Sequence, residues 1–185
     1  MYKSYPLFVF GFHGCERAVA EKVLSGGEDL KPSSNPYDWL GTGIYFWENA
    51  PERALQWARE RKKKDPCVIG AVIQLSCCLN LMDKGSAAEL KDAYETTLAL
   101  SADKSAPLPE NAGGLHRLDT FVINTATRLA EANGRAYDAV RGAFVEGDAV
   151  FPGSSVRADT HIQLCVRNPG CVVAYFRPKA AGGAP

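Results

Sequence analysis

The segment Gly41-Thr-Gly-Ile-Tyr-Phe-Trp-Glu48 decides the fold, because its glycines turn the backbone tightly before it continues as a short aromatic strand. Upstream, Phe12-His-Gly-Cys15 ends an apolar strand on a histidine and a glycine. We predict that the two segments meet in one cleft. An aromatic ring, an imidazole and an accessible glycine backbone together suit a flat heteroaromatic amide.

Nicotinamide is such an amide, and these residues resemble a known family. The His13-Gly14 pair, the Gly-x-Gly-Ile-Tyr-Phe strand and the Pro-Glu-Arg-Ala-Leu helix after it resemble the diphtheria-toxin-like ADP-ribosyltransferases, which include the poly(ADP-ribose) polymerases. In that family, residues matching His13 and Tyr45 open a His-Tyr-Glu triad that binds NAD. The resemblance implies an α+β ADP-ribosyltransferase fold with two packed, mostly antiparallel β-sheets and flanking helices. It also implies NAD as substrate and no metal.

The third triad position falls on Gln163, since Gln163-Leu-Cys-Val-Arg-Asn168 keeps the family's spacing to an asparagine. Glutamine can hydrogen-bond a ribose hydroxyl but brings no negative charge to an oxocarbenium-like state. Glu146 and Asp159 are nearby substitutes. We favour Glu146, which lies between an apolar strand and a glycine, although an exposed strand end explains it equally well. By resemblance, the missing glutamate favours mono-ADP-ribosyl transfer over polymer formation.

The same resemblance assigns ligand contacts. Gly14 would hold the carboxamide through its backbone, Tyr45 would stack on nicotinamide, and His13 would hydrogen-bond one of the two riboses. The pyrophosphate would lie near the start of a helix over 16–24. The residues expected to bind the cofactor are His13, Gly14, Tyr37, Trp39, Gly43, Tyr45, Phe46 and Arg141; the residues expected to act in catalysis are Gln163, Glu146, His13 and Tyr45.

Three of these assignments have structural alternatives. Tyr37 and Trp39 belong to the turn-rich loop 28–40, which is either a lid over the ligand or a loop that its aromatic rings pin to the core. Arg141 meets a phosphate or forms a surface ion pair. By strand alternation, His161 shares a face with Gln163 and is expected to flank the cleft.

The composition is that of an ordinary soluble protein: 46% of the 185 residues are hydrophobic, and 21 basic side chains balance 21 acidic ones. No net field therefore favours a nucleic-acid or membrane partner. The basic run Arg59–Lys64 is either a solvated helix end or a nucleic-acid contact. The apolar runs are too short for a secretory signal or a membrane span, so we expect a cytoplasmic protein. The six cysteines lack metal-ligand spacing and are expected to be buried free thiols.

We predict one domain over residues 1–177, with a helical insertion at about 84–133 and a disordered tail over 178–185. Asn49–Glu52 and Ser86–Glu89 have the form of capping boxes, and 101–114 reads as a surface loop. The remaining elements are helices ending near 64 and over 115–132, strands over 7–13, 41–48, 67–75 and 137–146, and a hairpin of 161–167 with 171–176 across Asn168-Pro-Gly170.

By resemblance, the expected partner is a macromolecular acceptor of ADP-ribose, either protein or nucleic acid. The likeness also implies a bacterial toxin or phage-defence effector, which an antitoxin or inhibitor protein would neutralise. Two rivals stay open: a catalytically inactive NAD- or ADP-ribose-binding module, consistent with Gln163, and a plain NAD glycohydrolase without an acceptor.

Overall fold

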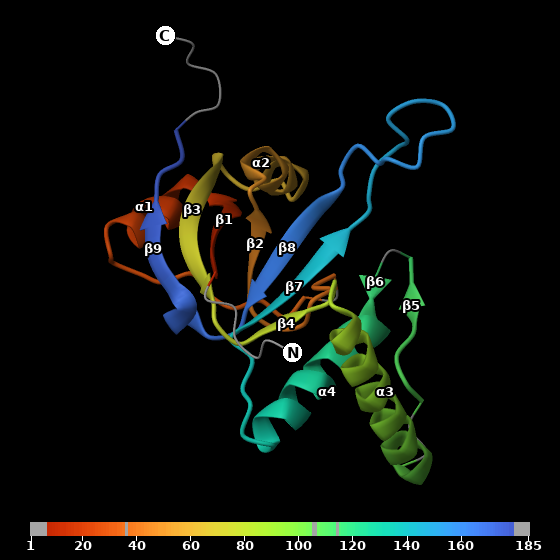
Figure 1. Ribbon diagram of the computed structural model, residues 1–185. Helices are drawn as coiled ribbons and strands as arrows, with labels where there is room; N and C mark the ends of the chain where they lie inside the picture. Colours follow the sequence, from red (N-terminus) through yellow and green to blue (C-terminus); the bar gives the residue numbers. More distant parts are fainter. Residues whose placement is uncertain (1–6, 36, 105–106, 114, 180–185) are drawn as a thin grey trace.

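Strand β1 (Leu7–Glu16) lies between β2 (Ile44–Glu48) and β3 (Pro66–Leu75) in the sheet (Figure 1). The computed structural model describes residues 7–35, 37–104, 107–113 and 115–179. Within these ranges the other elements are α1 (Arg17–Leu24), β2 (Ile44–Glu48), α2 (Pro51–Glu60), β3 (Pro66–Leu75), β4 (Cys78–Asn80), α3 (Lys84–Lys104), β5 (Asn111–Ala112), β6 (Leu115–His116), α4 (Arg117–Ala132), β7 (Ala139–Phe144), β8 (His161–Val166), the 3-10 turn η1 (Pro169–Cys171) and β9 (Val172–Phe176).

Seven strands form one mixed sheet in the order β4-β7-β8-β2-β1-β3-β9, and β5 and β6 form a separate small hairpin. The pairings are antiparallel except between β4 and β7, which run parallel. The predicted α+β class and mostly antiparallel pairing are confirmed. The prediction of two packed sheets is not, because β1 bonds to both β2 and β3 and so joins all seven strands.

The sheet is nearly divided between β1 and β2. β1 pairs with β3 along its whole length, from Leu7 to Glu16, but with β2 only at Gly11 and Phe12. One buried cluster nevertheless takes side chains from both halves, including Ile73 of β3 and Ala139 of β7. The sheet therefore curves around a common core while β1 and β2 separate beyond Phe12.

The glycines in the sequence predicted the helix ends better than the capping boxes predicted the helix starts. α1 closes at Gly26, whose φ is +73°, and α4 closes at Gly134, whose φ is +76°. Asn49 is not an N-cap: its φ is +53°, and Ala50 caps α2 without a side-chain hydrogen bond. Ser86 also fails as a cap, because α3 already begins at Lys84.

The predicted hairpin of the last two strands is wrong. β8 pairs with β2 and β7, whereas β9 pairs with β3 at the far edge of the sheet. Asn168 accepts a hydrogen bond from Gly170 N and donates one to Asp138 Oδ1 at 2.7 Å. These bonds tie the connection to the start of β7 and send the chain across the fold instead of back along β8.

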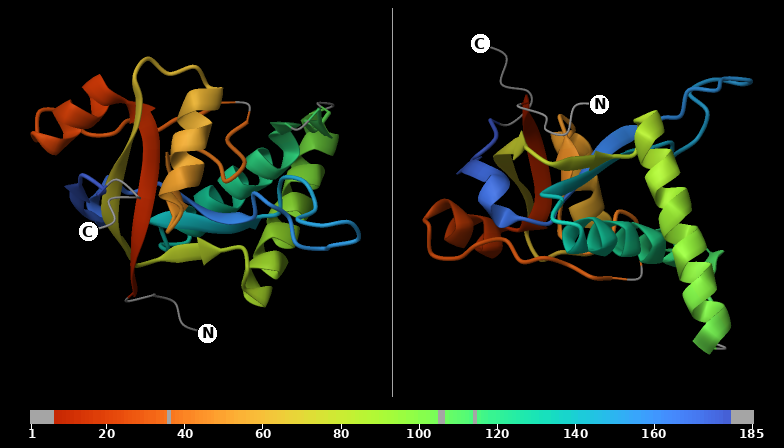
Figure 2. Two further views of the ribbon diagram at one scale, coloured as in Figure 1. Left: turned by 90° about the horizontal axis from the view of Figure 1, so that it is seen from above. Right: turned by 60° about the horizontal axis from the view of Figure 1, so that its bottom comes forward.

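The helices α3 and α4 pack together at one side of the sheet, as Figure 2 shows. The expected loop over 101–114 is partly wrong: α3 extends to Lys104, and β5 and β6 form a hairpin close to α4. Residues 105, 106 and 114 of that segment lie outside the described residues. Residues 180–185 of the predicted tail also lie outside them.

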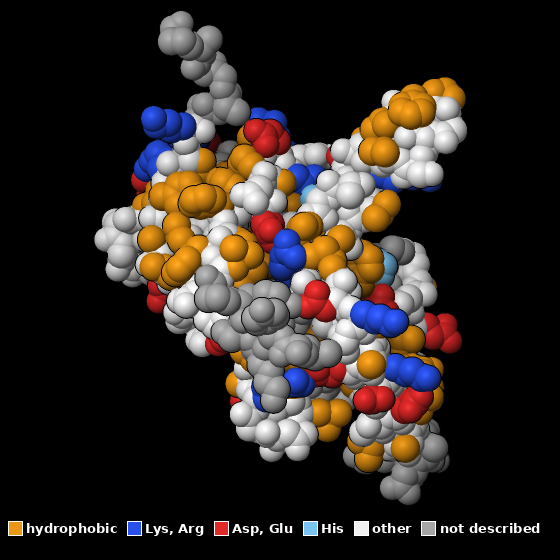
Figure 3. Space-filling view, in the orientation of Figure 1, with side chains coloured by type: hydrophobic (Ala, Val, Ile, Leu, Met, Phe, Trp, Pro, Cys, Tyr) orange, Lys and Arg blue, Asp and Glu red, His pale blue; other side chains and the backbone are white. Residues whose placement is uncertain are grey.

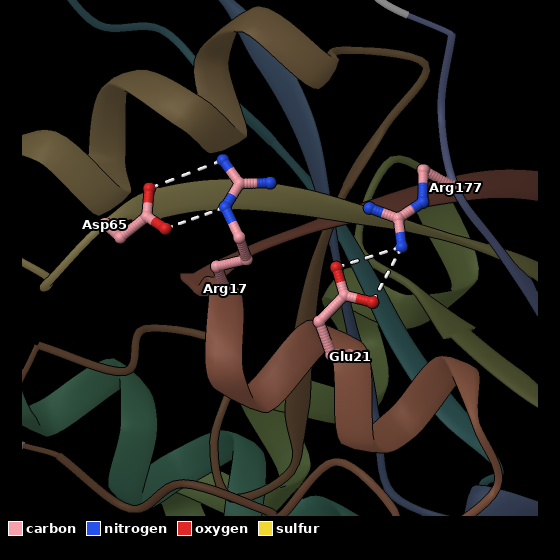
Figure 4. A network of polar contacts seen from close by, with 4 residues as sticks. All are labelled: Arg17, Glu21, Asp65 and Arg177. Carbon is pink, nitrogen blue, oxygen red and sulfur yellow. Dashed lines mark hydrogen bonds and ion pairs between the residues drawn. The ribbon is translucent and has the colours of Figure 1, made fainter.

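Two exposed ion pairs fasten α1 to its neighbours (Figure 4). Arg17 binds Asp65 at 2.7 Å, just before β3, and Arg177 binds Glu21 at 2.7 Å, just after β9. The partners are about half exposed, so solvent screens these pairs and they orient α1 more than they stabilise it.

The loop between β7 and β8 projects from the molecule (Figure 3). Its sides are joined by an isolated bridge between Ala149 and Arg157, and it exposes Val150, Phe151 and Val156.

The six cysteines are free thiols, and four of them are buried. None of the described helices is long and apolar enough to span a membrane.

Candidate active site

A pocket of ≈ 700 Å³ opens where β1 and β2 separate. Its volume is within the range of small-molecule and cofactor sites. Seven of the residues singled out in the sequence line it: His13, Gly14, Tyr37, Trp39, Tyr45, Glu146 and Gln163. The structure thus brings together residues from both halves of the sheet and from two loops.

His13 bridges the gap between the two strands. Its Nδ1 lies 2.7 Å from the backbone oxygen of Tyr45, which can only accept, so Nδ1 carries the proton. In the neutral ring Nε2 is then an acceptor, and it has no hydrogen-bond partner among the described residues. Burial lowers the pKa of His13, more than the Tyr45 hydrogen bond raises it, and Lys63 lowers it further. The ring is therefore neutral at pH 7 and can accept a hydroxyl hydrogen bond.

Gly14 allows the pocket wall to form. A Cβ at this position would lie 2.1 Å from the backbone oxygen of Ala54, so only glycine lets α2 approach β1 this closely. The oxygen of Phe10 accepts a hydrogen bond from Asn49 on the β2 side. By strand alternation the backbone of Gly14 faces that side too, where β2 has already separated. Its polar groups can therefore meet a carboxamide.

Tyr45 is held in place by its own hydroxyl, which donates to Gly41 O at 2.7 Å. The φ of Gly41 is +90°, a conformation that favours glycine. The turn at Gly41 and the Tyr45 ring are thus joined by the hydroxyl hydrogen bond. The ring is half-buried and lines the pocket. It can stack on a flat ligand there.

Gln163 and Glu146 lie on the β8 side of the pocket. Glu146 follows β7 and accepts a hydrogen bond from Arg53 Nη2 of α2 at 3.1 Å. Gln163 contacts His161 behind it, with 2.8 Å between the two Nε2 atoms. His161 is not among the pocket-lining residues, and neither is Asp159, the second carboxylate considered.

The loop 28–40 is held by contacts of its aromatic rings, and both rings also line the pocket. Trp39 stacks on His116 with 3.8 Å between ring centroids, and the Arg61 guanidinium lies 3.8 Å from the centroid of Tyr37. Between the two rings, Asp38 is a pocket-lining carboxylate with only 5% exposure, which accepts a hydrogen bond from Asn35 N.

Three predicted cofactor contacts lie outside the pocket lining. Phe46 is fully buried in the core, and Gly43 packs so tightly that a Cβ would lie 2.5 Å from Cys165 Sγ. Arg141 forms a bidentate pair with Glu48, at 2.6 and 2.8 Å, so its fork is already occupied. Alternation explains the position of Phe46: Tyr45 and Trp47 share the pocket face of β2, and Phe46 takes the other face.

Several lining residues were not identified from the sequence. α2 contributes Arg53 and Trp57, and Arg61 follows at its end; their i, i+4, i+8 spacing was a usable signal. Trp47 Nε1 and the Nε and Nη1 atoms of Arg53 are buried donors without a hydrogen-bond partner in the described chain, although Nη1 lies 3.8 Å from Glu60 Oε2 in an ion pair. Such donors are available to an oxygen-bearing ligand. His116 comes from the insertion, and nothing local in the sequence marks it. Among the described residues no group of three or more metal-ligating side chains is close enough to hold a metal.

The half-buried His13 and the buried His161 predict a stability loss in mild acid. Burial is the main cause that lowers the pKa of both His13 and His161, whereas the unfolded chain titrates near 6.5. Below that value the unfolded state binds more protons, so the free energy of unfolding should fall with pH by up to about 1.4 kcal/mol per unit for each histidine. Urea titrations between pH 7.5 and 5.5 would measure the slope. The His13→Gln/His161→Gln double variant should flatten it, and a level wild-type curve would contradict the prediction.

Comparison with known proteins gives one partial relative. The chain is 40% identical over 52 residues to an uncharacterized protein, MJ0359, of Methanocaldococcus jannaschii. The match covers 28% of this chain and 23% of that protein. No protein-family model and no solved structure matches.

Proposed function

We propose that this chain is an NAD-dependent mono-ADP-ribosyltransferase with the ADP-ribosyltransferase fold. The observation that carries the proposal is the pocket at the separation of β1 and β2, which His13, Gly14, Tyr45 and Gln163 line together. A neutral histidine acceptor, a fixed aromatic ring and a glycine backbone suit the nicotinamide riboside half of NAD.

In this proposal, nicotinamide stacks on Tyr45 and its carboxamide meets the backbone of Gly14. His13 Nε2 and the Gln163 side chain accept hydrogen bonds from ribose hydroxyls. Cations at the pocket rim, Lys31 and Lys63, would face the pyrophosphate near the start of α1.

The reaction breaks the bond between nicotinamide and the ribose, and the bonding electron pair leaves with nicotinamide. The oxocarbenium-like ribose then takes an electron pair from the acceptor, and Glu146 would remove the acceptor's proton. Asp38, a buried carboxylate in the same pocket, would favour the positive charge that develops.

A binding module without chemistry is the second candidate. It is favoured by Gln163 in place of a carboxylate and by the Arg53 contact, which occupies one oxygen of Glu146. This candidate predicts NAD binding without nicotinamide release.

Nicotinamide release from labelled NAD, with cell lysate as acceptor, separates the two candidates. Gln163→Ala and Glu146→Gln should each lower release or transfer by about tenfold, the effect of one lost hydrogen bond or proton acceptor. Glu95→Gln, on the exposed face of α3, is the matched control. Binding without release by the wild type would favour the module, and no binding would rule out both candidates.

Acceptor identity is tested on the same labelled lysate. Label removed by protease indicates a protein acceptor, label removed by nuclease indicates nucleic acid, and free ADP-ribose alone indicates a glycohydrolase. By resemblance we also propose a cytoplasmic toxin or phage-defence role with a neutralising antitoxin, which co-purification with the product of a neighbouring reading frame would test.

A further inference from the structure

The contact between His161 and Gln163 fixes the proton positions on both side chains. It joins two nitrogens, the Nε2 atoms, at 2.8 Å, so one nitrogen must donate and the other must accept. Nδ1 of His161 lies 2.6 Å from the backbone oxygen of Asp159, which only accepts, so Nδ1 carries the proton. In a neutral imidazole Nε2 is then the acceptor, and the Gln163 amide is the donor.

The surroundings keep His161 neutral and rigid. The residue is buried, and its ring stacks on Phe144 with 5.4 Å between centroids and 5° between planes. Burial lowers its pKa most; the Asp159 carbonyl raises it, as do the carboxylates of Glu146 and Asp159, and the Arg53 guanidinium lowers it.

This arrangement leaves the Gln163 oxygen free for a ligand. Its Nε2 is engaged by His161, while its Oε1 has no hydrogen-bond partner among the described residues, and the side chain lines the pocket. With Nε2 turned to His161, the amide group on the other side is Oε1, an acceptor like a glutamate oxygen; the second N–H of the amide has no partner among the described residues.

We propose that His161 is a positioning residue that holds the Gln163 amide with Oε1 toward the ligand, and that its protonation reverses that amide. A protonated ring would donate from Nε2, so Gln163 would turn Oε1 toward His161 and offer N–H to the pocket. The ligand group is a hydroxyl, and naming it as an NAD ribose hydroxyl rests on the proposed function.

The tautomer is measured first, because it needs no ligand. Nitrogen-15 NMR at pH 7.5, with the His161 signals identified by their loss in His161→Gln, should show a proton on Nδ1 and none on Nε2. The Gln163 side-chain amide signals, identified with Gln163→Ala, should shift as His161 titrates. A proton on Nε2 at pH 7.5 would overturn the proposal, whatever the protein does to NAD.

NAD affinity by calorimetry then tests the consequence. His161→Gln keeps an acceptor oxygen but cannot be protonated, so between pH 7.5 and 5.5 the wild type should lose more affinity than this variant. The difference should be severalfold but less than about tenfold, because burial lowers the pKa of His161 below its ordinary value of about 6.5. His161→Phe keeps the ring but not the acceptor, and should bind about tenfold more weakly at pH 7.5. Equal acid losses, or wild-type affinity in His161→Phe, would overturn the proposal. If the wild type itself fails to bind NAD, the proposed function fails and the tautomer measurement alone decides this inference.

Discussion

Gly14→Ala is expected to destabilise the protein by at least about 3 kcal/mol, a large part of the stability of an ordinary domain. The added Cβ would lie 2.1 Å from the backbone oxygen of Ala54 and 3.2 Å from the Cβ of Ala58. Both atoms belong to α2, and a backbone oxygen cannot rotate away, so the helix would have to shift from β1. Urea unfolding followed by circular dichroism measures the loss.

Gly27→Ala is the matched control. A Cβ at Gly27 would meet its nearest atoms at 3.5 and 3.6 Å, which is ordinary contact, and its φ is not positive. That variant should stay within about 0.5 kcal/mol of the wild type. Similar losses in the two variants would show that α2 does not approach β1 as closely as described.

The local patterns in the sequence predicted the elements around the site well. The apolar run from Leu7 and the aromatic strand after Gly43 are strands, and glycines close α1 and α4 as expected. The resemblance brought His13, Gly14 and Tyr45 into one cleft, and the structure places all three around one pocket. These predictions depend on short segments whose own residues determine the backbone.

The predictions that were wrong depend on contacts between residues that lie far apart in the sequence. Asn168-Pro-Gly170 has the composition of a hairpin turn, but the side chain of Asn168 bonds to Asp138, and β9 finds the free edge of β3. His116 reaches the pocket because it stacks on Trp39, which lies far away in the sequence. For Arg141 the sequence leaves a phosphate contact and an ion pair open, because it does not show that Glu48 is the neighbour across the sheet; the structure has the ion pair. Periodicity determines which face a residue takes, but not which strand lies beside it.

Tyr45→Ala is expected to lower nicotinamide release by on the order of 100-fold. Stacking of an aromatic side chain on a heterocyclic base contributes about 1–3 kcal/mol, and the upper end of that range corresponds to a factor of about 150. The upper end applies here because the hydroxyl bond to Gly41 fixes the ring before the ligand arrives. Tyr45→Phe keeps the ring and loses only that bond, so it should retain activity within about tenfold.

Tyr137→Ala separates loss of the ligand contact from loss of stability. Tyr137 packs on the same core cluster as Tyr45 and is also hydrogen-bonded, to Glu89 at 2.7 Å, but it does not line the main pocket. The two alanine variants should therefore lose comparable stability, and only Tyr45→Ala should lose activity when both are assayed below their melting temperatures. Equal activity losses would assign the effect of Tyr45 to packing. Unchanged release in Tyr45→Ala would mean that NAD does not bind against this ring, and the assignment of the pocket would fall with it.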